Sequence, residues 1–502
     1  MNKAGLIRLF RAMAGLGLLC GLLCISGHLS GQESVRLNLD EVMSMAHSQS
    51  REALSAKHRF RSSYWEYRTF RTQYLPMLNL NTTLPSLRRS IIKYTTLQGN
   101  DIFVEQSVAN YSLEMTLSKT LGFTGGSVFL RSGLDRIDNL SDSTFSTYLS
   151  NPVTLGISQP VLAYNPYRWD NKIEPIRYRE ARQRYLEDAE QVSISAINNF
   201  FDLLQAQLSL KIALTNEANY DTLFKIAQGR YNLGRIAEND LLQLELSFLK
   251  ARAEVENARL GLGMNVSKLK AFLRLPEQQE VSLVLPGPAN TLVVDLQQAV
   301  QVARANRSDI AGYERRELEA ESEVHKARLQ NRFNANLYAE YGLTQSAREL
   351  NEVYQNPQDG QVLAFGIQIP ILDWGLARGK IKMAESNREL VRTTIEQERI
   401  AFEQEVYLKV MQFNMQQNQL MLAAKADTVA QKRYYVTKQR YLIGKIDITE
   451  LNIAQTETDN AQLGYITALR NFWKTYFELR KLTLFDFLLN REIEVDFKSI
   501  YR

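Results

Sequence analysis

The amino-acid sequence predicts a mainly α-helical protein with membrane β-strands, built from two structural repeats of a strand pair plus a long helical hairpin. Three observations predict this fold class. Only eleven of the 502 residues are proline, and long proline-free stretches are rich in Leu, Ala, Glu, Gln and Arg, as in long helices. Short segments with alternating apolar residues, bounded by Gly and Pro, recur between those stretches. Two short motifs each occur twice at one fixed spacing, which is typical of an internal repeat.

The first 31 residues have the pattern of an export signal peptide. Three basic residues precede an apolar stretch at 12–25, and small residues follow it. We expect cleavage after Gly31, with cleavage after Gly27 as the alternative. Removal of this peptide takes away both cysteines and leaves 57 of the 60 basic residues against 55 acidic ones. The mature chain can then hold no disulfide or cysteine-ligated metal, and its small net charge does not indicate nucleic-acid binding.

Both repeated motifs recur at an offset of 210 residues. The first reads Gly-Ile-x-x-Pro-(Val/Ile)-Leu, at 156–162 and 366–372. Its prolines, Pro160 and Pro370, are expected where a strand becomes a helix, because proline cannot donate to a strand ladder and fixes φ. The second motif reads Arg-Tyr-x-x-Gly-(Arg/Lys)-Ile, at 230–236 and 440–446. The segment between the motifs therefore has one length in both halves, which indicates helices whose far ends meet at one level.

Each half reads as a helix, a strand region, a long helix, a tight turn and a returning helix. The halves begin alike at an offset of 257, so the first half holds 47 extra residues between about 80 and 153, which we interpret as an added β-hairpin and surface loop. The sequence predicts first helices at 39–74 and 296–331, strands at 77–83, 153–161, 335–342 and 362–371, and long helices at 167–231 and 376–441. Sixty-odd helical residues make a rod on the order of 95 Å.

The returning helices carry an apolar stripe that alternates three and four residues apart, which predicts coiled-coil packing. It contains Leu241, Leu244, Phe248, Ala251, Val255, Ala258 and Leu262 in the first half, with counterparts from Leu451 to Phe472 in the second. A single amphipathic stripe on a globular core is the alternative. The predicted organisation is a signal peptide (1–31), a first repeat (32–275), a proline-containing connector (276–292), a second repeat (293–485) and a C-terminal tail (486–502).

Strand counting predicts that the chain oligomerises if its strands span a membrane. Two spanning strands per half make four per chain, and an open sheet edge is not tolerated in lipid. The smallest barrels have about eight strands, so three chains with twelve strands are the simplest solution. Such a trimeric β-barrel would continue into an α-helical coiled-coil barrel.

The two motifs, each present twice and in register, resemble the TolC-like outer-membrane efflux family over about residues 37–485. The resemblance implies a homotrimer with a twelve-stranded barrel in the lipid of a Gram-negative outer membrane and a long periplasmic helical barrel. It implies passive export of small toxic molecules or drugs, and possibly proteins, with a periplasmic adaptor that opens the channel and an inner-membrane transporter that drives export. A type I protein secretion channel is the alternative, and a secreted coiled-coil scaffold without a pore is a further one.

An enzyme is disfavoured, since the sequence has no Gly-rich phosphate loop, GxSxG or HExxH motif. We therefore expect no cofactor, no catalytic residue and no metal site.

The resemblance also assigns roles to residues at the two helix-to-helix turns. It implies that the turns are adaptor-docking tips, formed by Arg230, Tyr231, Gly234, Arg440 and Gly444. It implies a periplasmic constriction formed by Glu450, Asp240, Asp447 and Tyr441. The alternative for the tips is ordinary hairpin geometry, and for Asp240 and Glu450 a favourable place near a helix N-terminus. Ile446 and Ile453 stand where the family pattern has charged residues, which predicts a more apolar gate.

Overall fold

A computed structural model describes residues 35–141, 144–287 and 292–501 of the chain. The predicted signal peptide lies outside the described residues. The chain forms two compact units. Unit 1 comprises Met1–Leu54, Gln191–Thr291 and Met415–Phe477, and unit 2 comprises Ser55–Glu190, Leu292–Asn414 and Glu478–Arg502. Each unit therefore contains parts of both sequence repeats.

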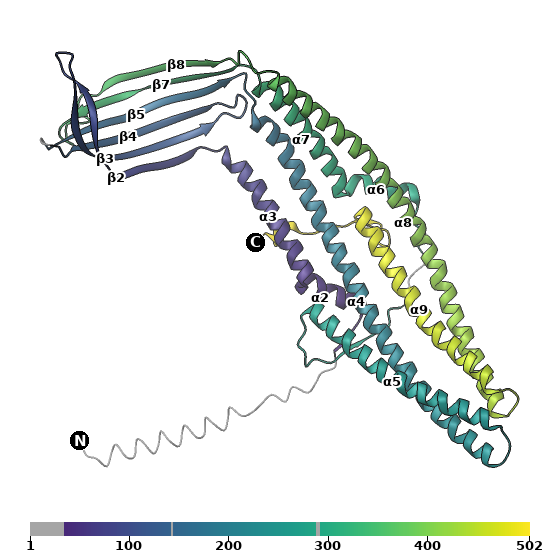
Figure 1. Ribbon diagram of the computed structural model, residues 1–502. Helices are drawn as coiled ribbons and strands as arrows, with labels where there is room; N and C mark the ends of the chain where they lie inside the picture. Colours follow the sequence, from purple (N-terminus) through teal and green to yellow (C-terminus); the bar gives the residue numbers. More distant parts are fainter. Residues whose placement is uncertain (1–34, 142–143, 288–291, 502) are drawn as a thin grey trace, which may run out of the picture. The chain divides into compact units, whose positions relative to one another are not determined.

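The lengths and bounds of the long helices confirm the internal repeat. Helices α4 (Pro166–Asn232) and α8 (Leu376–Leu442) have 67 residues each, and the returning helices α5 (Glu238–Leu273) and α9 (Ile448–Thr483) have 36 each (Figure 1). All four bounds repeat at the predicted offset of 210. Buried residues of α5 include Leu244, Ala251, Val255 and Ala258, so these four members of the predicted apolar stripe face a packed neighbour.

The expectation of one continuous first helix in each half is wrong. The first half has α2 (Leu39–Gln49) and α3 (Arg51–Gln73), and the second has α6 (Leu296–Asn306) and α7 (Ser308–Gln330), at an offset of 257. The break falls at Ser50 and at Arg307, whose ψ angles of 152° and 139° are extended. The Ser50 hydroxyl accepts a hydrogen bond from the Ala53 amide, so it caps the next helix instead of continuing the last.

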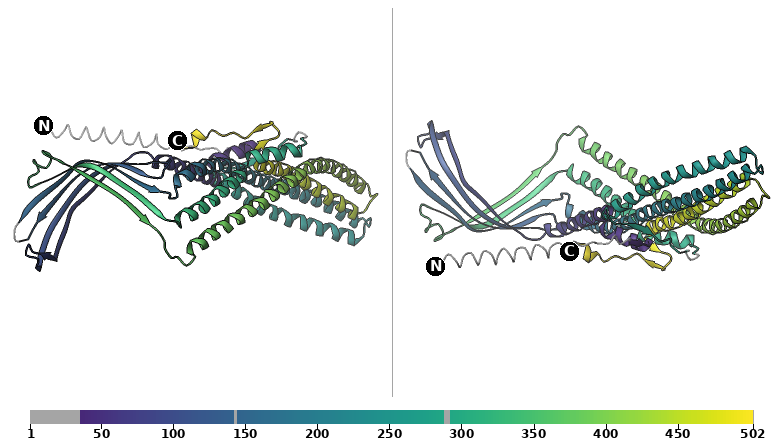
Figure 2. Two further views of the ribbon diagram at one scale, coloured as in Figure 1. Left: turned by 90° about the horizontal axis from the view of Figure 1, so that it is seen from above. Right: turned by 90° about the horizontal axis from the view of Figure 1, so that it is seen from below.

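Unit 2 contains one antiparallel six-stranded sheet in the order β2-β3-β4-β5-β7-β8 (Figure 1). Its strands are β2 (Met77–Thr95), β3 (Asp101–Thr120), β4 (Ser127–Asn139), β5 (Phe145–Val161), β7 (Asn334–Ala347) and β8 (Gln358–Gln368). The added segment of the first half forms two antiparallel strands, β3 and β4, which confirms the predicted β-hairpin. Both strands join the sheet, so the sheet has six strands in each chain, whereas the sequence-based count took four into the wall. The strands twist across the sheet, as antiparallel strands do (Figure 2).

Five short elements complete the described chain. In unit 1, β1 (Val35–Leu37) pairs in parallel with β6 (Val281–Leu283). In unit 2, β9 (Phe485–Asp486) pairs with β10 (Arg491–Glu492), and α10 (Phe497–Ile500) follows. Within the described residues, no helix combines the length and the apolar character needed to cross a membrane.

Candidate functional site

The two helix-to-helix turns of unit 1 have the same backbone geometry. Gly234 and Gly444 adopt φ angles of +65° and +73°, a region that favours glycine. The Gly234 amide donates to the Tyr231 carbonyl at 2.8 Å, and the Gly444 amide donates to the Tyr441 carbonyl at 2.9 Å. Nothing lies within 4 Å of a Cβ built on either glycine. The backbone angle, rather than crowding, therefore requires glycine at both turns.

An apolar cluster packs the two turns against each other. Its buried members come from all four helices: Leu223, Ala227, Leu244, Tyr441, Ile448 and Leu451. Ile236 from the first turn and Ile446 from the second pack against it. Both turns can pack on one apolar cluster only if the two helical hairpins are equally long. The equal helix lengths meet this requirement.

The side chain of Arg230, at the first turn, contacts residues at the second turn. Its guanidinium donates to the Leu442 carbonyl at 2.7 Å and lies 5.9 Å from the centre of the Tyr441 ring. The Leu442 carbonyl is at the C-terminal end of α8, where carbonyls lack helical partners and a cation is favourable. Burial raises the pKa of the Tyr441 hydroxyl, Arg230 opposes this rise, and the Asp240 charge adds to it. Arg230, Tyr441 and Asp240 therefore form one group between the turns.

The two acids near the start of α9 lie outside this group. Asp447 accepts a hydrogen bond from the Glu450 amide at 3.0 Å, which makes Asp447 the N-terminal cap of α9. Both side chains are exposed, whereas Asp240 is half-buried. The capping contact is a structural role for Asp447 that the acidic-entrance prediction did not include.

The other predicted tip residues face solvent. Tyr231 is 39% exposed, and Arg440, the equivalent of Arg230, is exposed too. The repeat is therefore asymmetric at this point: Arg230 contacts the second hairpin, while Arg440 projects into solvent.

A polar layer that the sequence did not reveal lies between α4 and α9, further along these helices. Asp459 accepts hydrogen bonds from Asn216 at 2.7 Å and from Gln455 at 2.9 Å, and burial raises the pKa of its carboxyl. The Tyr220 hydroxyl donates to the Asn452 side chain at 2.9 Å. Asp459 follows Thr458, a polar member of the predicted apolar stripe, but this signal does not identify the partner 243 residues away.

The two prolines occupy different places relative to the strand ends. Pro160 is within β5, next to its last residue, whereas Pro370 follows β8 in the connection to α8. The following connections contain left-handed residues, Leu162 at φ +59° and Trp374 at φ +53°. These backbone angles show where each chain segment changes direction between strand and helix.

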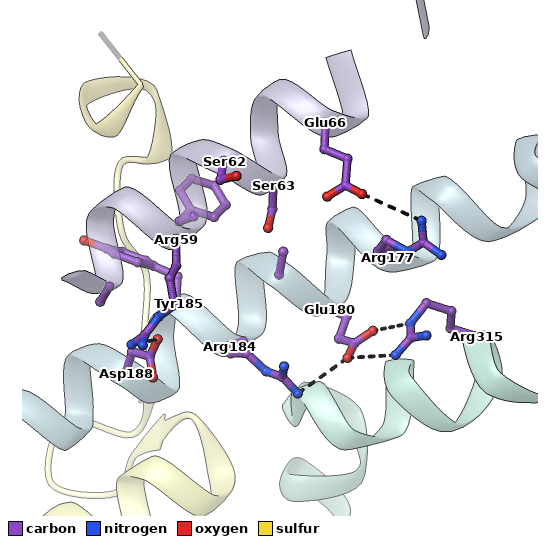
Figure 3. Close-up of a pocket in the computed structure, with 13 residues that line it drawn as sticks. Arg59, Ser62, Ser63, Glu66, Arg177, Glu180, Arg184, Tyr185, Asp188 and Arg315 are labelled. Carbon is purple, nitrogen blue, oxygen red and sulfur yellow. Dashed lines mark hydrogen bonds and ion pairs between the residues drawn. The ribbon is translucent and has the colours of Figure 1, made fainter. Parts of the chain in front are cut away.

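Unit 2 contains a cavity of about 490 Å³ lined by several arginines (Figure 3). Glu180 pairs with Arg315 at 2.6 Å and with Arg184 at 3.5 Å. Arg177 and Arg59 pair with acidic residues as well. Each of these arginines is paired with an acidic residue of the same unit. The residues that line the cavity therefore form an ion-pair network, which does not suit the binding of an anion. Among the described residues, no group of three or more His, Cys, Asp or Glu side chains could hold a metal ion.

The family model for the outer membrane efflux protein matches residues 42–273 and 299–483, most of the chain. This chain belongs to the outer membrane efflux protein family. The resemblance to TolC-like channels is thereby confirmed. The family consists of transport channels, so its members act by conducting substrates rather than by catalysis.

Solved channels and one curated relative are similar to this outer membrane efflux protein. The Campylobacter jejuni CmeC outer membrane channel superposes with a TM-score of 0.64, at 13% identity, over 92% of this chain and 89% of that one. The outer membrane protein VceC of Vibrio cholerae gives 0.62, at 14% identity, over 91% and 97%. These likenesses show the fold alone.

"Toxin and drug export protein A" of Aggregatibacter actinomycetemcomitans is 24% identical over 297 residues. That match covers 58% of this chain and 64% of the relative, so the chain spans less than two thirds of the relative's length.

Proposed function

We propose that this outer membrane efflux protein is the exit channel of a tripartite export system. Three copies form a tunnel whose strands lie in outer-membrane lipid and whose helices extend into the periplasm. The channel conducts passively, a periplasmic adaptor opens it, and an inner-membrane transporter drives export. The contact between the two turns, through Arg230, Tyr441 and their apolar cluster, is the observation that supports this function most.

The turns suit a gate because few side chains hold them together at the tips. At the turns themselves, apolar packing and the Arg230 contacts join the hairpins, whereas the hydrogen bonds of Tyr220 and Asn216 lie further along the helices. A partner that binds the exposed Tyr231 and Arg440 side chains can therefore part the turns without unfolding the helices. In three copies, Glu450 and Asp447 would place a ring of negative charge at the mouth, which favours cations. Pro160 and Pro370 would lie where the membrane strands meet the periplasmic helices.

The substrate class we propose is small toxic molecules or drugs, with secreted proteins as the alternative. The relative's name joins toxin and drug export. A strain lacking the gene separates the two: drug efflux predicts greater sensitivity to toxic small molecules, whereas type I secretion predicts loss of a secreted protein from the medium.

Extraction and conductance test the channel directly. We expect the full-length protein, produced with its signal peptide, to stay in the outer membrane in high salt and to dissolve in detergent. In planar lipid bilayers it should then give discrete conductance steps. Release by high salt, with no conductance, would favour a scaffold without a pore.

Crosslinking tests the docking tips. A photo-crosslinking residue at Tyr231 should capture the adaptor, while the same residue at Tyr354, which is exposed in the connection between β7 and β8, should not. Capture from both positions, or from Tyr354 alone, would contradict adaptor docking at the turns.

A further inference from the structure

The six-stranded sheet has two open edges. Within the described chain, β2 pairs only with β3, and β8 only with β7. No residue of either edge strand is buried. Long exposed strand edges invite pairing with another chain, because their amide and carbonyl groups lack partners. In lipid, where water cannot satisfy these groups, pairing becomes obligatory.

The directions of the two edge strands allow them to pair with each other between copies. Strand β2 begins shortly after α3 and runs away from the helices, whereas β8 returns and ends shortly before α8. A β8 edge therefore meets the β2 edge of a second copy in the antiparallel sense, as in every other pair of this sheet.

The added strands β3 and β4 lie inside the sheet. Strands β2 and β7 both begin at the offset of 257, which makes them equivalent, and β5 is the counterpart of β8. Between β2 and β5, β3 pairs with β2 from Met77↔Ser118 to Thr95↔Asp101. Likewise β4 pairs with β5 from Ser127↔Ser158 to Asn139↔Phe145. Both added strands are thus paired with a neighbouring strand on each side.

The added strands also continue both faces of the sheet. On one face, Leu80 is opposite Met115 and Leu130 is opposite Leu155, and all four side chains are at least 40% exposed. On the other face, Asn79 is opposite Thr116, and Glu114 pairs with Arg131 at 3.5 Å. Apolar exposed and polar residues therefore alternate in β3 from Tyr111 to Ser118, and Leu130 and Arg131 of β4 continue the two faces. This is the pattern of strands with lipid on one side and water on the other.

We propose that three copies close edge to edge, β8 of one copy against β2 of the next, into a wall of eighteen strands. The count follows from six strands in each copy, and it rests on the proposed function. A wall built from four strands in each copy would have twelve. Since barrel diameter grows roughly linearly with strand number, the eighteen-stranded exit is about 1.5 times as wide.

Imaging counts the strands directly. Cryo-electron microscopy of the full-length protein in lipid nanodiscs should show eighteen strands in the wall, with β3 and β4 among them. A wall of twelve strands, or one from which β3 and β4 are absent, would overturn the proposal.

Cysteine labelling gives an independent test, since signal cleavage leaves a cysteine-free chain. In membranes, a water-soluble maleimide should label Ser112→Cys and Thr116→Cys on the polar face and spare Leu113→Cys and Met115→Cys on the apolar face. Equal labelling of all four would place β3 outside the wall and refute the proposal.

The control pair comes from β5, which both strand counts place in the wall. Thr154→Cys should be labelled, and Leu155→Cys should be protected. Alternation in β5 without alternation in β3 would reject the eighteen-stranded wall alone. Loss of alternation in both strands would reject the membrane location and, with it, the proposed function.

Discussion

Arg230 contacts both hairpin tips, although the repeat places an equivalent arginine, Arg440, in solvent. A charged hydrogen bond and a cation–π contact contribute about 1–3 kcal/mol together. We expect Arg230→Ala to loosen the closed state and raise the open probability of single channels roughly tenfold. Arg440→Ala is the matched control and should leave it unchanged. An equal rise in both variants would contradict a specific role for Arg230.

Two substitutions of Asp447 separate the effect of its capping hydrogen bond from the effect of its charge. Asp447→Ala removes the side-chain acceptor of α9 and should lower the free energy of unfolding by about 0.5–2 kcal/mol. Asp447→Asn keeps an acceptor of similar strength and should lose little. Urea unfolding in detergent, followed by circular dichroism, measures both. Altered cation selectivity in Asp447→Asn, with unchanged stability, would show that the charge matters to conduction.

Glu450 tests the predicted acidic constriction. Three exposed carboxylates around one axis would bind divalent cations, so we expect Glu450→Ala to lose sensitivity to divalent block in single-channel recordings. Glu238→Ala removes another acid from the first turn of a returning helix and serves as the control. Unchanged block in Glu450→Ala would reject the constriction and leave the favourable helix N-terminus as the explanation of this acid.

At the scale of elements, an ion pair in unit 2 joins Glu190, in the first half of α4, to Arg480, in the last turn of α9. Arg480 donates to Glu190 Oε1 at 2.9 Å, while Glu190 Oε2 is buried without a hydrogen-bond partner among the described residues. Burial raises the pKa of the Glu190 carboxyl to about 7, although Arg480 opposes the rise. Protonation therefore favours the packed state.

This raised pKa gives stability a definite pH dependence. Because the folded pKa exceeds the usual value of 4.5, the contribution is fully present below pH 4.5 and is lost as pH rises through about 7. We expect the melting temperature in detergent to fall across this window and Glu190→Gln to flatten the profile. Glu385→Gln is the control, since the pKa of Glu385 is about 2. An unchanged slope above pH 5.5 in Glu190→Gln would contradict this account.

At the scale of the whole molecule, the equal lengths of the two hairpins can be tested by deletion. Removing residues 210–216 and 253–259 shortens the first hairpin by about 10 Å, so its turn can no longer reach the shared apolar cluster. We expect a lower melting temperature and a leaking channel. Removing 420–426 and 463–469 as well shortens both hairpins equally and should restore closure. A double variant as leaky as the single one would show that matched length is not what closes the turns.

How much could be predicted from sequence differs between local and distant contacts. The helix lengths, the two turn glycines and the offsets of 210 and 257 were predictable, because helical hydrogen bonds and turn angles depend on residues close together in the chain. The break at Ser50 was also encoded locally, as a capping serine, but the apolar periodicity on both sides concealed it.

The sequence alone determined a twofold repeat of long helical hairpins and the family to which the chain belongs. Only the tertiary structure decided that β3 and β4 join the sheet, that Arg230 rather than Arg440 bridges the turns, and that Asp459 bonds to Asn216. Each of these contacts joins a segment to a partner that no local periodicity specifies. Strand neighbours and side-chain partners are chosen by packing in three dimensions, and for Arg230 and Leu442 that choice brings together residues more than two hundred positions apart.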